Sequence, residues 1–168
     1  MIDVTLGYTP GCIGRIAELH ATYYARTAGF GLAFEARVAR ELSAFCERYD
    51  PARDGLWLVR QDGDGRIEGS IAIDGLHGHD DDAGAHLRWF IVADALRGQG
   101  VGRALLQAAI DFVDARGYGR TVLDTFEGLD AARHLYEAAG FRLVAQSPGA
   151  QWGQVVNEQR FERVRAVD

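Results

Sequence analysis

Residues 86–120 read HLRWFIVADALRGQGVGRALLQAAIDFVDARGYGR, and this stretch decides the fold. Its first part, residues 87–92, is a short and nearly continuous apolar run, which is typical of a strand covered on both faces. After Val101 the apolar residues follow helical spacing, at Leu105, Leu106, Ala109, Phe112 and Val113. The stretch therefore predicts a buried strand, a glycine-rich bend and an amphipathic helix that lies on a sheet.

The glycine-rich bend has the features of a phosphate-binding loop. Glycine permits positive φ and lets the backbone approach a ligand closely, and the first N–H groups of a helix lack intrahelical partners. These donors and the helix dipole favour a phosphate, to which flanking arginines can add charge-assisted hydrogen bonds. The alternative is a tight connection whose glycines serve only backbone geometry. We expect the binding loop to consist of Arg97, Gly98, Gln99, Gly100, Val101, Gly102 and Arg103.

Two common phosphate-binding loops do not fit this bend. It lacks the GxxxxGK[ST] pattern, and the chain contains no lysine, which excludes a nucleoside triphosphate P-loop. It also does not read GxGxxG, and it lies in the middle of the chain rather than in a first βαβ unit. Both facts argue against a dinucleotide-binding fold.

Three segments of the chain together resemble the GNAT superfamily of N-acetyltransferases. Residues 97–102, which follow the apolar strand, resemble the R/Q-x-x-G-x-G/A acetyl-CoA loop of that family. Residues 121–125 are similar to the family's next strand, and residues 131–141, AARHLYEAAGF, resemble its A..LYE..GF helix-to-strand signature. The resemblance covers residues 67–144. It implies an α/β (α+β) fold with a central mixed, mostly antiparallel sheet of about six to seven strands, flanked by about four helices.

A finer resemblance concerns the end of the chain. Residues 151–162, together with Gly29, Phe30, Phe34 and Glu35, resemble the acetyltransferase half of bacterial proteins that place a MarR-type winged helix before a GNAT domain. The winged-helix half is absent from this sequence. We therefore do not transfer the DNA-binding role that such fusions imply.

Length, composition and charge limit the classes of function. The chain has 168 residues, 48% hydrophobic and 25% charged, which predicts one globular domain over residues 1–168. No apolar run is long enough for a bilayer and no signal pattern begins the chain, so we expect a cytoplasmic protein without a membrane partner. The formal net charge is −6, which argues against nucleic-acid binding and mildly favours an amine substrate. Cys12 and Cys46 are expected to be reduced, packed thiols.

The remaining elements are predicted from periodicity and turn residues. Helices are expected over residues 13–26 and 33–49, separated by a break at residues 28–31. Strands are expected over residues 4–8, 56–59, 67–76, 141–144 and 152–164. A hairpin turn is expected at residues 62–65, a long polar loop at residues 77–84, and a further turn at residues 147–149.

The resemblance to the GNAT family also assigns the donor end of the site. It places the pantetheine arm of acetyl-CoA, the expected cosubstrate, beside the backbone of Phe90, Ile91 and Val92. A backbone N–H there, that of Ile91 or Val92, could polarise the thioester carbonyl in the manner of an oxyanion hole. Leu129 falls where many relatives carry an asparagine that touches CoA, so that contact is expected to be missing or replaced.

The same resemblance implies that Tyr136 is the general acid. It lies where the family places the tyrosine that donates a proton to the departing CoA thiolate. A phenol with a pKa of about 10 is a plausible acid for a thiol of about 8.5. The alternative is a packing role, because Tyr136 shares a helix stripe with Ala132 and Leu135.

The general base is less well marked. An alkylamine with a pKa of about 10.4 must lose a proton before it attacks. His86, where many GNAT-like chains carry Glu, is the first candidate, and its alternative is a strand-end histidine. Glu35 is the second, and its alternative is a first-turn acid favoured by the helix dipole. Asp124 could hold the amine or merely cap a turn.

A metal site is not expected. His77, His79, Asp80, Asp81 and Asp82 include ligand types, but their spacing matches no ordered site, and a solvated acidic loop is the preferred interpretation. Trp57 and Trp152 could line an acceptor pocket or be core aromatics.

Three functional hypotheses follow. The first is an acetyl-CoA-dependent N-acetyltransferase that acts on a primary amine of a small molecule, protein or peptide. The second keeps the fold without turnover, as a CoA-binding sensor or regulatory module, and the third is a purely structural α/β domain. The resemblance also allows a homodimer, because relatives are often dimers.

Overall fold

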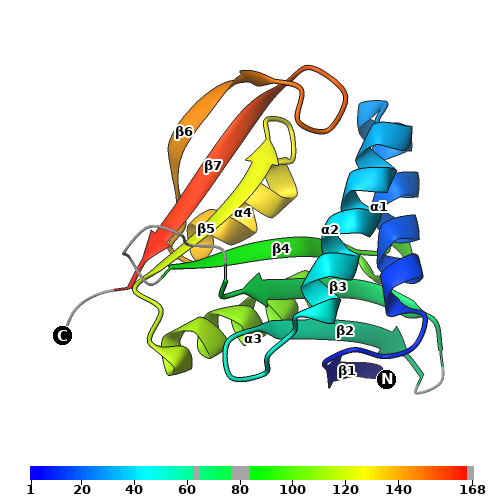
Figure 1. Ribbon diagram of the computed structural model, residues 1–168, viewed down its shortest axis with the longest axis vertical. Helices are drawn as coiled ribbons and strands as arrows, with labels where there is room; N and C mark the ends of the chain where they lie inside the picture. Colours follow the sequence, from blue (N-terminus) through cyan, green and yellow to red (C-terminus); the bar gives the residue numbers. More distant parts are fainter. Residues whose placement is uncertain (63–64, 77–83, 166–168) are drawn as a thin grey trace.

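A seven-stranded sheet runs through the computed structural model, which describes residues 1–62, 65–76 and 84–165 (Figure 1). The strand order is β1-β2-β3-β4-β5-β7-β6. All neighbours are antiparallel except β4 and β5, which are parallel. The strands are β1 (Ile2–Leu6), β2 (Gly55–Gln61), β3 (Ile67–Asp74), β4 (Gly84–Val92), β5 (Arg120–Phe126), β6 (Arg142–Gly149) and β7 (Val156–Val164).

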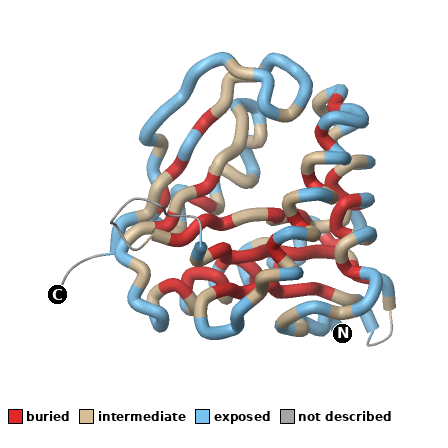
Figure 2. Tube along the Cα trace, in the orientation of Figure 1, coloured by how far each residue is buried: buried red, intermediate tan, exposed pale blue. Residues whose placement is uncertain are grey.

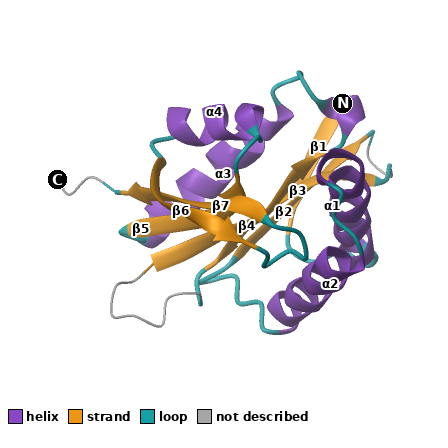
Figure 3. Ribbon diagram, turned by 90° about the horizontal axis from the view of Figure 1, so that it is seen from above, coloured by secondary structure: helices purple, strands orange, loops and turns teal. Residues whose placement is uncertain are grey.

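Four α-helices cover the two faces of this sheet (Figure 3). They are α1 (Cys12–Ala28), α2 (Leu32–Glu47), α3 (Val101–Arg116) and α4 (Asp130–Ala138), and a short 3-10 helix, η1 (Asp94–Leu96), precedes α3. Strand β2 shows why both faces need cover: Leu56 and Leu58 pack toward α1 and α2, whereas Trp57 and Val59 pack toward α3. Buried residues accordingly gather along the central strands and on the inner sides of the helices (Figure 2).

Strands β4 and β5 separate soon after they begin. They pair only at Gly84–Arg120, Ala85–Thr121 and His86–Val122. Beyond these positions β5 stays paired with β7 along its whole length, while β4 stays with β3. The sheet therefore opens between the second half of β4 and the second half of β5.

A β-bulge lies in the part of β4 that borders this opening. Ser70 pairs with Ile91 and Ala72 pairs with Arg88, so that Ile71 faces two residues, Trp89 and Phe90. Trp89 has a φ of 48°, which is rare for a bulky residue. The Ser70 hydroxyl donates a hydrogen bond of 2.7 Å to the Trp89 carbonyl and so fixes the bulge from the neighbouring strand.

The structure confirms the predicted fold class and most elements. The mixed, mostly antiparallel sheet has seven strands, four α-helices flank it, and α1 and α2 are separated by Gly29 and Gly31 as the break at residues 28–31 predicted. Cys12 is buried and Cys46 half-buried, and both are free thiols. None of the helices in the described part of the chain is both long and apolar enough to cross a membrane.

Several predicted boundaries are wrong. The first strand spans Ile2–Leu6 rather than residues 4–8, because Gly7, with a φ of 94°, turns the chain out of the sheet. Residues 147–149 belong to β6 and are not a turn. This strand is at the edge of the sheet, where Pro148 leaves no ladder bond broken. The turn follows at residues 150–154, so the last strand begins at Val156 and not at Trp152.

Candidate active site

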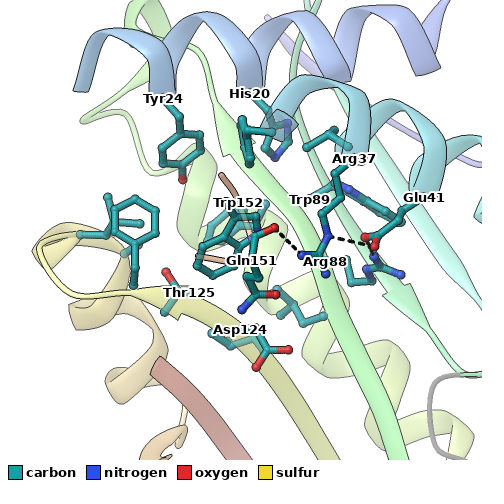
Figure 4. A pocket seen from close by; sticks show the side chains of 18 of the residues that line it. His20, Tyr24, Arg37, Glu41, Arg88, Trp89, Asp124, Thr125, Gln151 and Trp152 are labelled. Atoms are coloured by element: carbon teal, nitrogen blue, oxygen red, sulfur yellow. Dashed lines mark hydrogen bonds and ion pairs between the residues drawn. The ribbon is translucent and has the colours of Figure 1, made fainter. Parts of the chain in front are cut away.

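A cavity of about 180 Å³ occupies the opening between β4 and β5 (Figure 4). Leu87, Arg88, Trp89 and Phe90 line it from β4, and Leu123, Asp124, Thr125 and Phe126 line it from β5. Helices α1 and α2, helix α4 and the turn between β6 and β7 close its other sides. The residues from these segments are His20, Tyr24, Phe30, Phe34, Arg37, Val38, Glu41, Leu129, Ala132, Tyr136, Gln151 and Trp152, with His86 at the base of β4.

The predicted phosphate loop lies at the other end of β4, where η1 leads into α3. Gly98 and Gly100 have φ of 77° and 79°, and a Cβ added to either would meet no atom within 4 Å. Gly100 is the N-cap of α3, without a side-chain cap, so first-turn N–H groups remain available to a ligand. Such an open, positively polarised helix end can bind a phosphate group.

The residues that flank this loop take two different positions. Arg97 donates to the Val92 carbonyl over 3.1 Å and to the Tyr23 hydroxyl over 3.1 Å, and it lies 3.3 Å from Asp94. Arg103 is exposed in the first turn of α3. Phe90, Ile91 and Val92 precede the loop along β4, and a Cβ added to Gly102 would lie 3.5 Å from the Phe90 ring. The predicted strand residues and the predicted loop residues are thus adjacent, at the end of β4 and the start of α3.

Tyr136 comes from α4 into the cavity wall. Its side chain is 7% exposed, and its ring packs against Phe90, Phe141 and Phe161 at centroid distances of 6.0 to 6.1 Å. Burial raises the pKa of the Tyr136 hydroxyl well above its usual value, and the neighbouring Tyr24 adds to this effect. The hydroxyl therefore keeps its proton at neutral pH. Tyr136 both packs and lines the cavity, so the two roles considered for it are compatible.

His86 and Asp124 meet across the point where β4 and β5 separate. His86 is buried, and its Nε2 lies 3.4 Å from Oδ2 of Asp124. Arg160 on β7 donates to both oxygens of the same carboxylate over 2.9 and 3.1 Å. Burial opposes the charge of Asp124, but the bonds from His86 and Arg160 outweigh it and hold the pKa of this carboxyl well below its usual range.

Glu35 lies apart from this group. It is exposed in the first turn of α2 and does not line the cavity. Two other polar residues of α2 do so, Arg37 and Glu41. The Arg37 Nε donates to Glu41 over 3.0 Å, and Glu41 also accepts a hydrogen bond from Arg88 of β4. A sequence signal for the pair existed, because Arg37 and Glu41 border the apolar stripe of Phe34, Val38 and Leu42.

His20 of α1 is another residue of the cavity that sequence reasoning missed. It is 6% exposed, and its Nδ1 lies 2.8 Å from the Ile16 carbonyl. Because a carbonyl only accepts, Nδ1 carries the hydrogen and Nε2 is left as an acceptor. Burial lowers the pKa of His20 to about 4, so the ring is neutral near pH 7. Its place in an otherwise apolar helix stripe was the available signal.

The two tryptophans considered for the acceptor pocket have different positions. Trp152 lines the cavity, whereas Trp57 packs edge-on against Phe112 in the core beneath α3. No group of three or more His, Cys, Asp or Glu side chains is placed to hold a metal ion within the described ranges. The loop with His77, His79 and Asp80 to Asp82 lies outside them.

Comparisons with known proteins show which family and which relatives this chain resembles. A family model described as the acetyltransferase (GNAT) family matches residues 15–141. Mycothiol acetyltransferase of Beutenbergia cavernae is 40% identical over 106 residues, which cover 62% of this chain and 33% of that protein. The chain thus spans about a third of the length of this curated relative.

Solved structures show the same fold. An acetyltransferase from Salmonella typhimurium, solved with its cofactor acetyl-CoA, has a TM-score of 0.76 at 19% identity, over 100% of this chain and 98% of that one. A chain of the NatC complex bound to Gag peptide and CoA has a TM-score of 0.77 at 14% identity, over 98% and 99% of the two chains.

Proposed function

The chain belongs to the acetyltransferase (GNAT) family, and from this premise we propose that it transfers the acetyl group of acetyl-CoA to a primary amine of a small molecule or peptide. One observation carries the proposal. The open glycine loop at the start of α3 and the tyrosine of α4 border the same strand, β4, at the point where the sheet opens into a cavity.

The loop and β4 would hold the donor. Acetyl-CoA supplies the activated acetyl group. The N–H groups of Val101, Gly102 and Arg103 at the start of α3 would bind its diphosphate, with the exposed Arg103 side chain beside them. The free edge of β4 at Phe90, Ile91 and Val92 would pair with the pantetheine arm.

Hydrogen bonding at the end of β4 favours Val92 over Ile91 as the donor to the thioester carbonyl. The Ala93 N–H donates to the Glu68 carbonyl over 2.7 Å, and the Val92 carbonyl faces away from β3 and accepts from Arg97. N–H groups alternate in direction along an antiparallel strand, so the Val92 N–H points toward the opening. There it would stabilise the negative charge that develops on the carbonyl oxygen.

Two residues would move protons. Tyr136, whose hydroxyl stays protonated, would donate its proton to the departing thiolate sulfur. His86 would take the proton of the attacking amine, while Asp124, itself fixed by Arg160, holds the imidazole and stabilises its charged form. The proposal does not use Glu35, which lies outside the cavity.

An acetyl-transfer assay tests this function. The protein is incubated with acetyl-CoA and a panel of primary amines and peptides, and both the free CoA thiol and the acetylated product are measured. We expect product formation in proportion to thiol release for at least one class of amine. Binding of acetyl-CoA without any acetylated product would contradict the proposal and favour the CoA-binding module instead.

A further inference from the structure

The side of the cavity formed by α2 carries a guanidinium group with spare donors. Arg37 uses Nε for Glu41 and one N–H for the Gln151 carbonyl, at 3.0 and 2.7 Å. A guanidinium has five N–H donors, so three have no acceptor among the residues that the structure describes. Figure 4 shows Arg37, Glu41 and Arg88 gathered at one side of the cavity, with Tyr24 and Thr125 toward the other.

The charges around Arg37 do not cancel. Glu41 is shared by Arg37 and Arg88, and the fully buried Asp74 is shared by Arg88 and Arg48. Three guanidinium groups thus meet two carboxylates, a formal excess of +1. The Asp124–Arg160 pair adds no net charge. In a chain with a formal net charge of −6, this surplus beside a half-enclosed cavity favours an anionic group on the acceptor.

An aromatic wall adjoins this positive side. Phe30 lies 5.0 Å from Phe34, 5.2 Å from Phe126 and 6.3 Å from Trp152, measured between ring centroids, and all four rings line the cavity. The turn after β6 joins the two features, because Gln151 fixes Arg37 and the next residue, Trp152, contributes to the wall. An anion-binding group and an aromatic surface are therefore adjacent in the cavity.

Resting on the proposed acetyltransferase function, we propose that the acceptor is an aromatic amino acid with a free carboxylate. The carboxylate binds the spare donors of Arg37, and the aromatic side chain packs against Phe30, Phe126 and Trp152. The α-amino group then faces the remaining polar wall, where His86 and Asp124 lie. Arg37 is thus a residue that determines specificity and takes no part in proton transfer.

Matched acceptors isolate the carboxylate. Phenylalanine and phenylalaninamide share ring and amine but differ in charge, and the amide has the less basic amine, which favours its attack at neutral pH. We expect kcat/KM for phenylalanine to exceed that for the amide by about 10-fold or more, as a charge-assisted hydrogen bond implies.

Variants of α2 test whether Arg37 is responsible for the preference for the carboxylate. Arg37→Gln should lower kcat/KM for phenylalanine by about 10- to 100-fold and leave the amide within about threefold, while Arg37→Lys should retain part of the preference. Arg40→Gln is the control, because Arg40 is exposed on the same helix and does not line the cavity. Thermal unfolding confirms that each variant is folded. Equal losses on both acceptors in Arg37→Gln would overturn the inference.

A binding measurement separates this inference from the proposed function. Phenylalanine is titrated by calorimetry into the protein loaded with CoA, for the intact chain and for Arg37→Gln. Binding that depends on Arg37 without any turnover would support the acceptor site and contradict the acetyltransferase. Acetylation of amines with no preference for the carboxylate would overturn the acceptor class and leave the acetyltransferase standing.

Discussion

Tyr136 lies between two cavities, and its burial determines how it can act. It lines the opening between β4 and β5 and also a smaller cavity of about 90 Å³ beside the start of α4. Burial and the neighbouring Tyr24 raise the pKa of its hydroxyl, with no hydrogen bond to another described residue among the causes, so the hydroxyl stays protonated. A buried, protonated hydroxyl without a hydrogen bond to another described residue is suited to donate its proton to a leaving group.

Replacement of Tyr136 by phenylalanine tests that role. The ring contacts with Phe90, Phe141 and Phe161 remain, so the fold and the affinity for acetyl-CoA should change little. We expect kcat to fall by about 10²- to 10⁴-fold, the usual contribution of a general acid. Steady-state kinetics and acetyl-CoA titration measure the two effects. An unchanged kcat would assign Tyr136 to packing alone.

His20 predicts a pH dependence of stability. Its pKa is about 4 in the folded chain and about 6.5 when unfolded, so the unfolded chain binds more protons between these values. Stability should therefore fall as the pH drops from about 6.5 to 4, by roughly 3 kcal/mol at 1.36 kcal/mol per pKa unit.

Chemical denaturation of the intact chain and of His20→Gln, at a series of pH values, measures this contribution. The free energy of unfolding of the variant should decline less over the same range, because glutamine does not titrate. Parallel curves for the two proteins would show that His20 does not carry this dependence.

At the scale of elements, the bulge in β4 aims the backbone that borders the cavity. Ser70→Ala removes the hydroxyl that binds the Trp89 carbonyl. We expect a loss of about 1 kcal/mol of stability and, because the bulge loosens, a fall in kcat of about 10-fold. Ser43→Ala is the control, since Ser43 binds the Ala39 carbonyl over 2.6 Å within α2, away from the cavity.

The control should keep its turnover and change little in stability, because the helix propensity of alanine offsets the lost bond to the i−4 carbonyl. Stability is measured by denaturation and turnover by acetyl-transfer kinetics at saturating acetyl-CoA. If both variants lost turnover equally, the bond to Trp89 would have no positioning role.

Sequence patterns within single segments predicted the helices and strands, whereas the geometry of the site depends on how different strands pair. The strand, bend and helix of residues 87–116 are encoded by adjacent residues, so periodicity was sufficient to find them. The bulge at Trp89 depends on the register of β4 against β3, and the opening depends on how far β4 follows β5. Neither is encoded in one segment. Arg37, Glu41 and Arg88 also come together only in the folded chain. The resemblance to MarR-type fusions stays a prediction.

Across the whole molecule, Asp74 links three elements. It sits at the end of β3, fully buried, and accepts hydrogen bonds from Arg48 after α2, from Arg88 on β4 and from the Leu76 N–H. Burial opposes its charge, but these partners, Arg48 foremost, outweigh it and hold the pKa of Asp74 below its usual value.

Asp74→Asn should destabilise the chain by about 3 kcal/mol at neutral pH, since it leaves Arg48 and Arg88 short of a partner. Because the pKa of Asp74 is lowered in the folded chain, its carboxylate stabilises the fold at pH values above the unfolded pKa of about 3.9. This stabilisation is lost as the pH falls through the folded-state pKa. The difference between the two proteins, measured by denaturation, should be constant near neutrality and shrink below about pH 4. A difference that grew in acid would contradict this account.

The central claim is that the loop before α3 binds acetyl-CoA, and calorimetric titration tests it most directly. The intact chain is compared with Gly100→Glu and with Gly117→Glu, because Gly117 ends α3 at a φ of 77°, close to the 79° of Gly100, and has equally open surroundings. Both variants suffer the same backbone strain, but only Gly100→Glu places a carboxylate where the diphosphate would lie. We predict a Kd on the order of micromolar for the intact chain and Gly117→Glu, and binding at least about 100-fold weaker for Gly100→Glu. Absence of binding to the intact chain, or equal affinity in all three proteins, would contradict the claim.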